Sequence, residues 1–195
     1  MKIAIIDYGA GNIQSVKFAL QRLGYQASLT ADPEEISAAD KVIFPGVGAA
    51  GSAMEKLRVS GLDALIPTLK QPVLGICVGM QLMCRYCEEG DTRGLGIFEA
   101  DVRRFDDRLK VPQIGWNQIT QLSSSLFHGI AEEAYMYLVH SYYAPVNAQA
   151  IASATYGVTY AAALQEKNFY GVQFHPEKSS REGARILKNF LTIDV

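Results

Sequence analysis

Cysteine is scarce in this chain of 195 residues, and neither sign of charge dominates it. Three cysteines are an odd number for a disulfide framework, which a chain of this length does not need, so we expect a reducing cytoplasm as its setting. Eighteen basic and twenty acidic residues give a formal net charge of −2, with no run of like charges. This balance predicts neither nucleic acid nor an anionic membrane surface as a partner.

Long hydrophobic runs are also missing. The first apolar stretch, residues 3–6, reaches Asp7 after four residues, which is too short for the apolar part of a secretion signal. Residues 134–165 contain no Asp, Glu, Lys or Arg, but His140, Ser141, Pro145 and other polar residues interrupt them. We therefore predict buried strands and turns there, and no membrane span.

Apolar residues make up 49% of the chain, which is enough for one sizeable core and predicts a single domain over residues 1–195. In the first half, short apolar runs alternate with amphipathic segments. Strands are predicted at residues 3–6, 25–30, 41–44 and 73–76, and helices at 13–23, from Pro33, at 53–70 with a break near Gly61, and at 78–87.

From Gly94 onward, strand-like pieces follow one another, and a helix is predicted last. The strands are expected at residues 97–105, 113–120, 135–141, 151–156, 160–165 and 169–174, and the helix at 180–191. Ser179 and Glu182 have the spacing of a capping box for that helix. The whole pattern predicts an α/β fold of three layers: an open, mostly parallel sheet with helices on both faces and additional antiparallel strands in the C-terminal half.

Cys77 occupies the nucleophile position of the pentapeptide Gly75-Ile76-Cys77-Val78-Gly79, between a predicted strand and a predicted helix. This is the context of a nucleophile elbow, in which glycines relieve crowding in a sharp turn. A helix N-terminus also stabilises a thiolate. The alternative interpretation is a small apolar side chain packed at the end of a strand.

His175 and Glu177 follow another apolar strand, separated only by Pro176. If this segment stays extended, both side chains lie on one side, so the carboxylate can hold one imidazole nitrogen while the other faces a thiol. Alone, His-Pro-Glu is more often a surface turn. Together with the elbow it predicts a base and its orienting carboxylate, at the sheet edge where sites gather in α/β proteins.

Backbone donors for an oxyanion are expected from two places. The loop Pro45-Gly46-Val47-Gly48 follows the third predicted strand, and its glycines let a peptide N–H such as that of Val47 approach closely. The N–H of Val78, directly after the candidate nucleophile, would be the second donor. The alternative for the glycine-containing loop is an ordinary turn.

These motifs resemble the triad-type, class I glutamine amidotransferases, which combine Gly-x-Cys-x-Gly with a distant His-Pro-Glu. More narrowly, segments along nearly the whole chain resemble the family of glutaminase subunits of imidazole glycerol phosphate synthases. These segments are Asp7-Tyr8-Gly9-Ala10-Gly11-Asn12, Pro45-Gly46-Val47-Gly48, Gly75-Ile76-Cys77-Val78-Gly79-Met80-Gln81, Gln113-Ile114-Gly115-Trp116-Asn117, His140-Ser141-Tyr142 and Gln173-Phe174-His175-Pro176-Glu177-Lys178-Ser179.

The resemblance implies that Cys77 attacks the side-chain amide of glutamine, that His175 carries the proton and that Glu177 orients His175. It implies no cofactor and no metal. Substrate contacts are implied for the backbone of Gly48 and for Gln81, Glu89, Ser141 and Tyr142.

In that family the ammonia passes to a separate cyclase subunit, a (β/α)8 barrel. The cyclase forms imidazole glycerol phosphate and aminoimidazole carboxamide ribotide in histidine biosynthesis. The resemblance therefore implies a heterodimer, with Asn12, Trp116, Asn117 and Lys178 at the contact with the cyclase.

Other interpretations remain open. The chain could be the glutaminase of a different synthase, another cysteine hydrolase, or a binding module that kept the fold without activity. Cys84 and Cys87 have the spacing of a metal or redox pair, but no second Cys-x-x-Cys occurs and both lie inside a predicted helix, so we expect them to pack in the core.

Overall fold

Seven strands form the central sheet of the computed structural model, which describes residues 1–9 and 13–193. The order across the sheet is β11-β12-β13-β4-β3-β1-β2. The parallel strands are β1 (Ile3–Ile6), β2 (Ser28–Thr30), β3 (Lys41–Gly46), β4 (Val73–Cys77) and β13 (Phe169–Val172). The antiparallel strands β12 (Val158–Glu166) and β11 (Ala150–Tyr156) extend one edge. The predicted mostly parallel sheet is confirmed.

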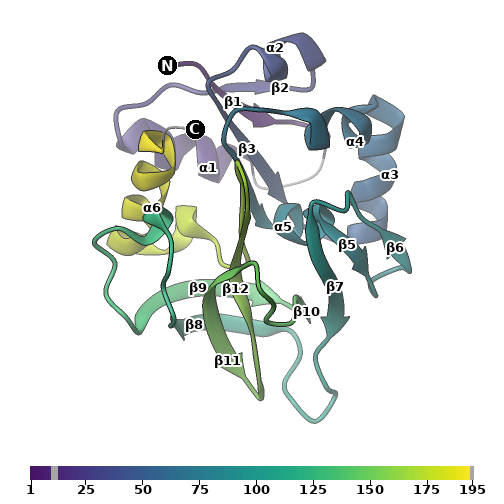
Figure 1. Cartoon of the computed structure of the whole chain (residues 1–195), viewed down its shortest axis with the longest axis vertical. Coiled ribbons are helices and arrows are strands. Elements are labelled where there is room, and N and C mark those ends of the chain that lie inside the picture. The colour runs from purple at the N-terminus through teal and green to yellow at the C-terminus, as the bar shows by residue number, and fades with distance from the viewer. Residues whose placement is uncertain (10–12, 194–195) are drawn as a thin grey trace.

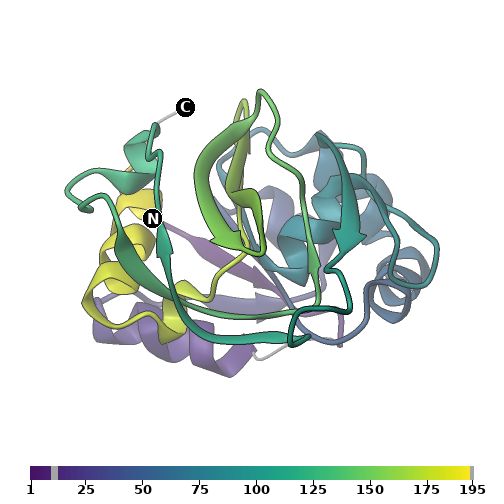
Figure 2. The same ribbon diagram turned by 90° about the horizontal axis from the view of Figure 1, so that it is seen from below.

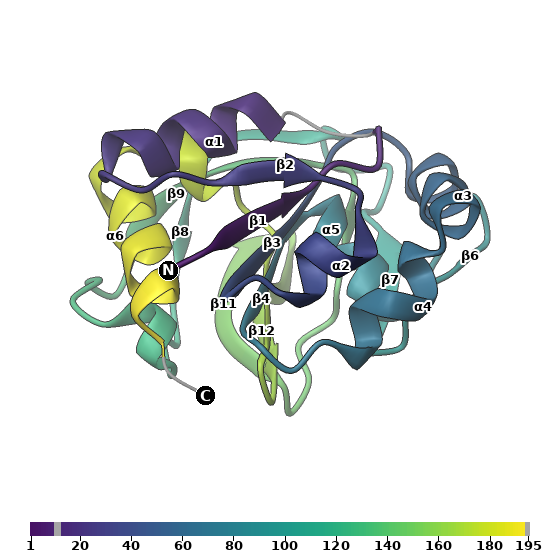
Figure 3. The same ribbon diagram turned by 90° about the horizontal axis from the view of Figure 1, so that it is seen from above.

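Helices cover both faces of this sheet (Figures 1 and 3). On one face lie α1 (Ile13–Arg22) and α6 (Ser180–Thr192), and on the other lie α3 (Ala50–Ser60), α4 (Leu62–Leu65) and α5 (Val78–Met83). The short α2 (Pro33–Ser37) connects β2 to β3, and single turns of 3-10 helix occur at η1 (Ile66–Thr68), η2 (Ser125–Phe127) and η3 (Pro176–Lys178). Because both faces are covered, β1, β3 and β4 are buried at every position.

Local signals fix several of these helices. The Asp32 carboxylate accepts a hydrogen bond from the Glu34 N–H at 2.9 Å, and Pro33 occupies the first helical position, so α2 begins as predicted. Gly61 takes a left-handed φ of 70° and ends α3, which is the predicted break. Within the described residues, no helix is long and apolar enough to cross a membrane.

Two smaller sheets lie beside the central one. The first has the order β10-β7-β5-β6, and the second is the antiparallel hairpin β8-β9. Their strands are β5 (Cys84–Cys87), β6 (Thr92–Arg93), β7 (Phe98–Arg104), β8 (Gln113–Ile119), β9 (Ala134–His140) and β10 (Tyr142–Tyr143). In Figures 1 and 2 the hairpin runs across the end of the central sheet at which β3 and β4 finish.

The helix predicted over residues 78–87 is wrong in its second half. It ends at Met83, and Cys84–Cys87 is the strand β5 instead, because it pairs with β7 on one side and β6 on the other. The expected antiparallel strands of the C-terminal half are present in the pairs β8-β9, β11-β12 and β12-β13, but two strands of this half also pair in parallel. The strand β7 runs parallel to β5, and β13 inserts into the parallel core beside β4.

Candidate functional site

Cys77 ends β4 and immediately precedes α5, so the predicted strand-to-helix elbow is confirmed. Its φ of 54° and ψ of −110° are strained for a residue with a side chain. A Cβ on Gly79 would lie 2.0 Å from the Phe44 carbonyl oxygen, and one on Gly75 would lie 2.5 Å from the Met83 sulfur. The glycines therefore let α5 approach the sheet, and this close approach holds the turn at Cys77.

His175 follows β13 and is paired with Glu177. The His175 Nδ1 and Glu177 Oε1 atoms are 2.9 Å apart, and the two side chains are only 5% and 2% exposed. The backbone is extended at His175, with φ of −99° and ψ of 95°, but the extended segment stops there, because Pro176–Lys178 forms the turn η3. The turn still brings the two side chains together. The Glu177 carboxylate accepts the Nδ1 hydrogen of His175, which leaves the Nε2 atom available.

The surroundings of His175 favour its protonated form. Burial of the ring opposes the positive charge, but the neighbouring Cys77 and Glu177 side chains outweigh burial and raise the pKa of His175 to about 10. No hydrogen-bond donor among the described residues reaches the other oxygen of Glu177, Oε2. The carboxylate is therefore directed at the imidazole alone within this part of the chain.

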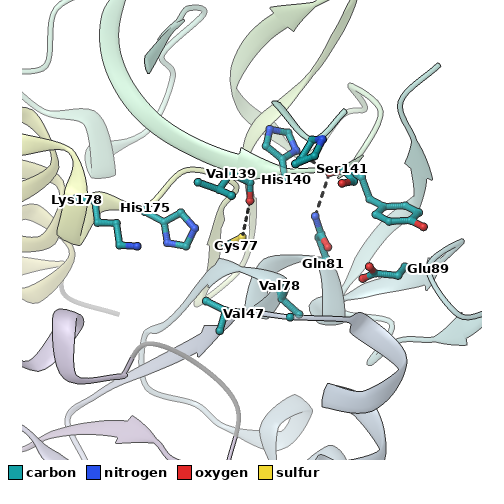
Figure 4. Close-up of a pocket in the computed structure, with 13 residues that line it drawn as sticks. Val47, Cys77, Val78, Gln81, Glu89, Val139, His140, Ser141, His175 and Lys178 are labelled. Atoms are coloured by element: carbon teal, nitrogen blue, oxygen red, sulfur yellow. Dashed lines mark hydrogen bonds between the residues drawn. The ribbon is translucent and has the colours of Figure 1, made fainter. Parts of the chain in front are cut away.

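Cys77 and His175 line one cavity of about 310 Å³ (Figure 4). The cavity lies at the carboxyl ends of β3 and β4, where Gly46 pairs with Cys77. Its lining includes ten of the residues singled out from the sequence: Val47, Gly48, Cys77, Val78, Gln81, Glu89, Ser141, Tyr142, His175 and Lys178. Segments separated by almost a hundred residues thus meet at one sheet edge.

The lining residues are arranged on two sides of the sulfur. In Figure 4, His175 and Lys178 lie on one side of Cys77, and Gln81 and Glu89 lie on the other. An elongated molecule bound across the sulfur would place one end beside the imidazole and the other beside an amide and a carboxylate.

Val47 and Val78, the two residues expected to supply backbone donors, both line the cavity beside Cys77 (Figure 4). Val78 is the first residue of α5, where peptide N–H groups have no partner within the helix. The loop that carries Val47 is fixed at its start, because the Tyr8 hydroxyl donates to the Pro45 carbonyl at 3.1 Å. Gly48 has a φ of 87°, which favours glycine at that position.

The predicted substrate contacts already have partners within the protein. The Gln81 Nε2 group donates to the Tyr142 carbonyl at 3.1 Å and to Gln173 Oε1 at 2.9 Å. Glu89 Oε2 accepts the Ala50 N–H at 2.7 Å and so caps the start of α3. Each side chain still borders the cavity, as do Ser141 and Tyr142.

Pro112, Val139 and His140 also line the cavity and were not predicted as site residues. The Cys77 thiol lies 3.8 Å from the Val139 carbonyl oxygen. Burial lowers the pKa of His140 to about 4, despite the 2.7 Å bond to the Tyr142 carbonyl, so this ring is neutral at pH 7. The motif His140-Ser141-Tyr142 was the only sequence signal for this wall, and it did not show which atoms face the cavity.

The residues expected at a partner contact are scattered. Trp116 is 51% exposed on β8 and stacks edge-on against Tyr137, whereas Asn117 is half-buried and donates to the Thr155 carbonyl at 2.9 Å. Neither residue lines the cavity, although Lys178 does. Asn12 lies outside the described residues.

The predicted capping box of α6 is wrong. Ser179 makes no side-chain cap, and its hydroxyl instead donates to the His175 carbonyl at 2.7 Å and accepts the Tyr137 N–H at 2.9 Å. A second bond, from the His175 N–H to the Tyr137 carbonyl, runs beside it at 2.9 Å. Ser179 therefore ties the His175 segment to β9, which forms one wall of the cavity.

Cys84 and Cys87 are free and buried, and burial raises the pKa of each thiol, to about 11 for Cys87. They pack in the core as expected, on β5 and not in a helix. In the part of the chain that the structure describes, no three His, Cys, Asp or Glu side chains gather as metal ligands would.

Known proteins match the chain over nearly its full length. A family model described as glutamine amidotransferase class-I matches residues 4–193. The imidazole glycerol phosphate synthase subunit HisH of Bacteroides fragilis is 55% identical over 99% of this chain and 100% of its own length. The subunit of that name in Escherichia coli K12 is 48% identical over 98% and 99%. A solved structure, that of a putative GMP synthase subunit from Thermoplasma acidophilum, shares the fold with a TM-score of 0.76 at 24% identity, over 98% of this chain and 92% of that one.

Proposed function

Because the chain belongs to the class I glutamine amidotransferases, and within them to the HisH subunits of imidazole glycerol phosphate synthase, we propose that Cys77, His175 and Glu177 are its catalytic triad. The observation that carries this proposal is that His175, which Glu177 holds at 2.9 Å, lines the same cavity as the strained Cys77. A nucleophile, a base and a group that orients the base are the components that acyl transfer requires.

The reaction begins when the Cys77 sulfur attacks the side-chain amide carbon of glutamine. An imidazolium beside the sulfur favours the thiolate that makes this attack. The carbonyl π electrons move to oxygen, and the N–H groups of Val47 and Val78 stabilise the resulting oxyanion. Losing one such donor typically costs about 2.7–4 kcal/mol of transition-state stabilisation.

His175 then gives its proton to the amide nitrogen, the carbon–nitrogen bond breaks, and ammonia leaves a thioester on Cys77. Water attacks this thioester, and His175 accepts a proton from the attacking water. The carbon–sulfur bond breaks, glutamate is released and Cys77 returns to its starting state. Glu177 keeps its negative charge and stabilises the imidazolium at each stage.

The glutamine head group is assigned to the side of the cavity that holds Gln81 and Glu89. The Glu89 carboxylate complements the α-ammonium group of an amino acid, and Gly48, Ser141 and Tyr142 complete the surface around it. This orientation places the side-chain amide at Cys77 and directs the leaving nitrogen toward His175.

The ammonia is proposed to pass to a cyclase subunit of the (β/α)8 barrel type. This partner forms imidazole glycerol phosphate and aminoimidazole carboxamide ribotide, and the two chains form a heterodimer in the cytoplasm. Asn12, Trp116, Asn117 and Lys178 are the proposed contacts. Support comes from β8 and β9, where Ile114, Trp116 and Tyr135 are exposed although they are large and apolar.

Glutamate release tests this proposal. It is measured for the chain alone, with a barrel-type cyclase, and with the cyclase and its substrate together. We expect release to rise when both are added and to fall to background with Cys77→Ala. Release that survives Cys77→Ala would contradict the triad, and a cyclase that neither binds nor stimulates would point to a different synthase.

A further inference from the structure

The side chain of Gln173 is fully buried next to Cys77, and neither the elbow nor the His-Pro-Glu motif gives it a role. Its Nε2 group donates to the Cys77 sulfur at 3.7 Å. We propose that Gln173 stabilises the thiolate of Cys77, and that Gln81 is a positioning residue that orients the Gln173 amide for this contact. This inference rests on the proposed role of Cys77 as nucleophile.

The orientation of both amides follows from one backbone atom. The Tyr142 carbonyl can only accept a hydrogen bond, so the Gln81 atom that lies 3.1 Å from it must be the nitrogen. The second hydrogen of that nitrogen points to Gln173 at 2.9 Å, which must therefore present its oxygen. The Gln173 nitrogen is then the atom that faces Cys77. A chain of hydrogen bonds thus connects the Tyr142 carbonyl on β10, which accepts, to the nucleophile.

Because both glutamine side chains are buried, their amide groups need partners within the protein. Gln173 is 0% exposed and Gln81 is 3% exposed, and burying an amide is unfavourable unless its polar atoms have partners. The sulfur is one of the partners of the Gln173 amide. A donor held against a thiolate stabilises charge that has little access to water, and hydrogen bonds to charged groups are stronger than neutral ones.

Gln81 connects this contact to the other side of the cavity. Both hydrogens of its nitrogen are used within the protein, so its oxygen is left as the acceptor that can meet an ammonium group. A ligand that binds there holds Gln81, and Gln81 in turn holds Gln173. The proposed binding of the amino acid head group and the preparation of the sulfur therefore use one side chain.

The pH dependence of Cys77 alkylation tests the proposal. Iodoacetamide reacts with the thiolate, and peptide mass spectrometry measures the rate at Cys77 in the full chain without glutamine. With Gln173→Leu we expect the midpoint of the profile to rise by about one pH unit, so that alkylation below that midpoint slows about tenfold. With Gln173→Glu, which keeps the shape and places a carboxylate near the sulfur, we expect a larger rise.

Gln81→Leu and Gln165→Leu complete the series. Gln81→Leu leaves the donor in place but removes its support, so its midpoint should lie between those of the unaltered chain and Gln173→Leu. Gln165 is the matched control, because its amide also has two side-chain partners, Ser124 and Tyr170, and makes no contact with Cys77. We expect an unchanged profile with Gln165→Leu.

Other titratable or charged groups also face Cys77. From the elements around the sulfur these are Tyr8, Glu89, His140, His175, Glu177 and Lys178. All of them are present in every variant, so a shift between variants reports on the altered glutamine. Cys84 and Cys87 serve as folding controls, since they are alkylated only when the core opens.

Two results would overturn the inference. One is a profile for Gln173→Glu that superimposes on that of the unaltered chain. The other is a slower rate at every pH with no change of midpoint, which reports altered access to the sulfur. If Cys84 and Cys87 are alkylated in Gln173→Leu, the core of that variant has opened. The profile of Gln173→Glu then decides whether the inference holds. Failure of this test leaves the proposed triad intact when Cys77→Ala still abolishes glutamate release.

Discussion

Glu177 places a negative charge in the protein interior, and its partner His175 supplies the compensating positive charge. The pKa of His175 is raised above its ordinary value of 6.5 to about 10, so the folded chain holds this proton more tightly than the unfolded chain does. The contribution of protonated His175 to the free energy of unfolding is fully present below about pH 6.5. That contribution is lost as the pH rises through about 10.

Glu177→Gln tests this linkage. Removing the carboxylate lowers the pKa of His175, so we expect the variant to be less stable than the unaltered chain at about pH 6. The difference should shrink as the pH approaches about 10. Urea denaturation across this pH range measures it. A difference that stays constant with pH would show that the pair does not hold the proton.

Single residues were predictable from the sequence where local sterics decide. The glycines around Cys77 indicated the elbow, because glycine allows the close contacts of α5 with β3 at Gly79 and with β4 at Gly75. His175 and Glu177 were paired correctly, although the chain is extended only at His175 and turns at η3 after it. The role of Ser179 could not be predicted, because one of its two partners, the Tyr137 N–H, lies on β9, some forty residues earlier in the chain.

At the scale of elements, the packing of α5 on β3 fixes the elbow, and Gly79→Ala tests it. The new methyl group would lie 2.0 Å from the Phe44 carbonyl oxygen, so we expect the free energy of unfolding to fall by about 1–3 kcal/mol. Gly51→Ala is the control, because Gly51 lies in the helix α3 with its nearest neighbour at 3.3 Å. Equal stability of the two variants would show that this packing is loose.

The junction between β9 and the start of α6 depends on Ser179, which is almost fully buried. Ser179→Ala leaves the Tyr137 N–H without its partner and releases the His175 carbonyl, so we expect a loss of about 1–3 kcal/mol in chemical denaturation. The exposed Ser37, which donates within α2, is the control, and Ser37→Ala should change stability by less than about 0.5 kcal/mol. Similar effects of both substitutions would contradict the role of Ser179 as a tie.

Elements that depend on distant pairing were the hardest to predict. Residues 84–87 continue the apolar pattern of α5, but pairing with β6 and β7 makes them a strand. Parallel strands buried on both faces were easier, since β1, β3 and β4 are short apolar runs bounded by turns. The position of β13 between β4 and β12 has no local signal.

The whole molecule presents an exposed apolar strip on β8 and β9, consisting of Ile114, Trp116 and Tyr135. If the cyclase binds here, Trp116→Ala should weaken the complex about tenfold or more, as for the large aromatic residues that dominate many interfaces. Val59, which is 82% exposed on α3, provides the control. Isothermal titration measures the affinity of each variant for the cyclase. Equal affinity for Trp116→Ala and Val59→Ala would exclude the strip from the interface.

The most direct test of the central claim is covalent labelling by a glutamine analogue whose amide is replaced by a diazomethyl ketone. Such an analogue alkylates the group that attacks the amide carbon, and peptide mass spectrometry identifies that group in the chain with its cyclase. The account predicts one adduct, on Cys77 and not on Cys84 or Cys87, with glutamate release lost in proportion to labelling. Full glutamate release from a chain whose Cys77 is completely alkylated would contradict it.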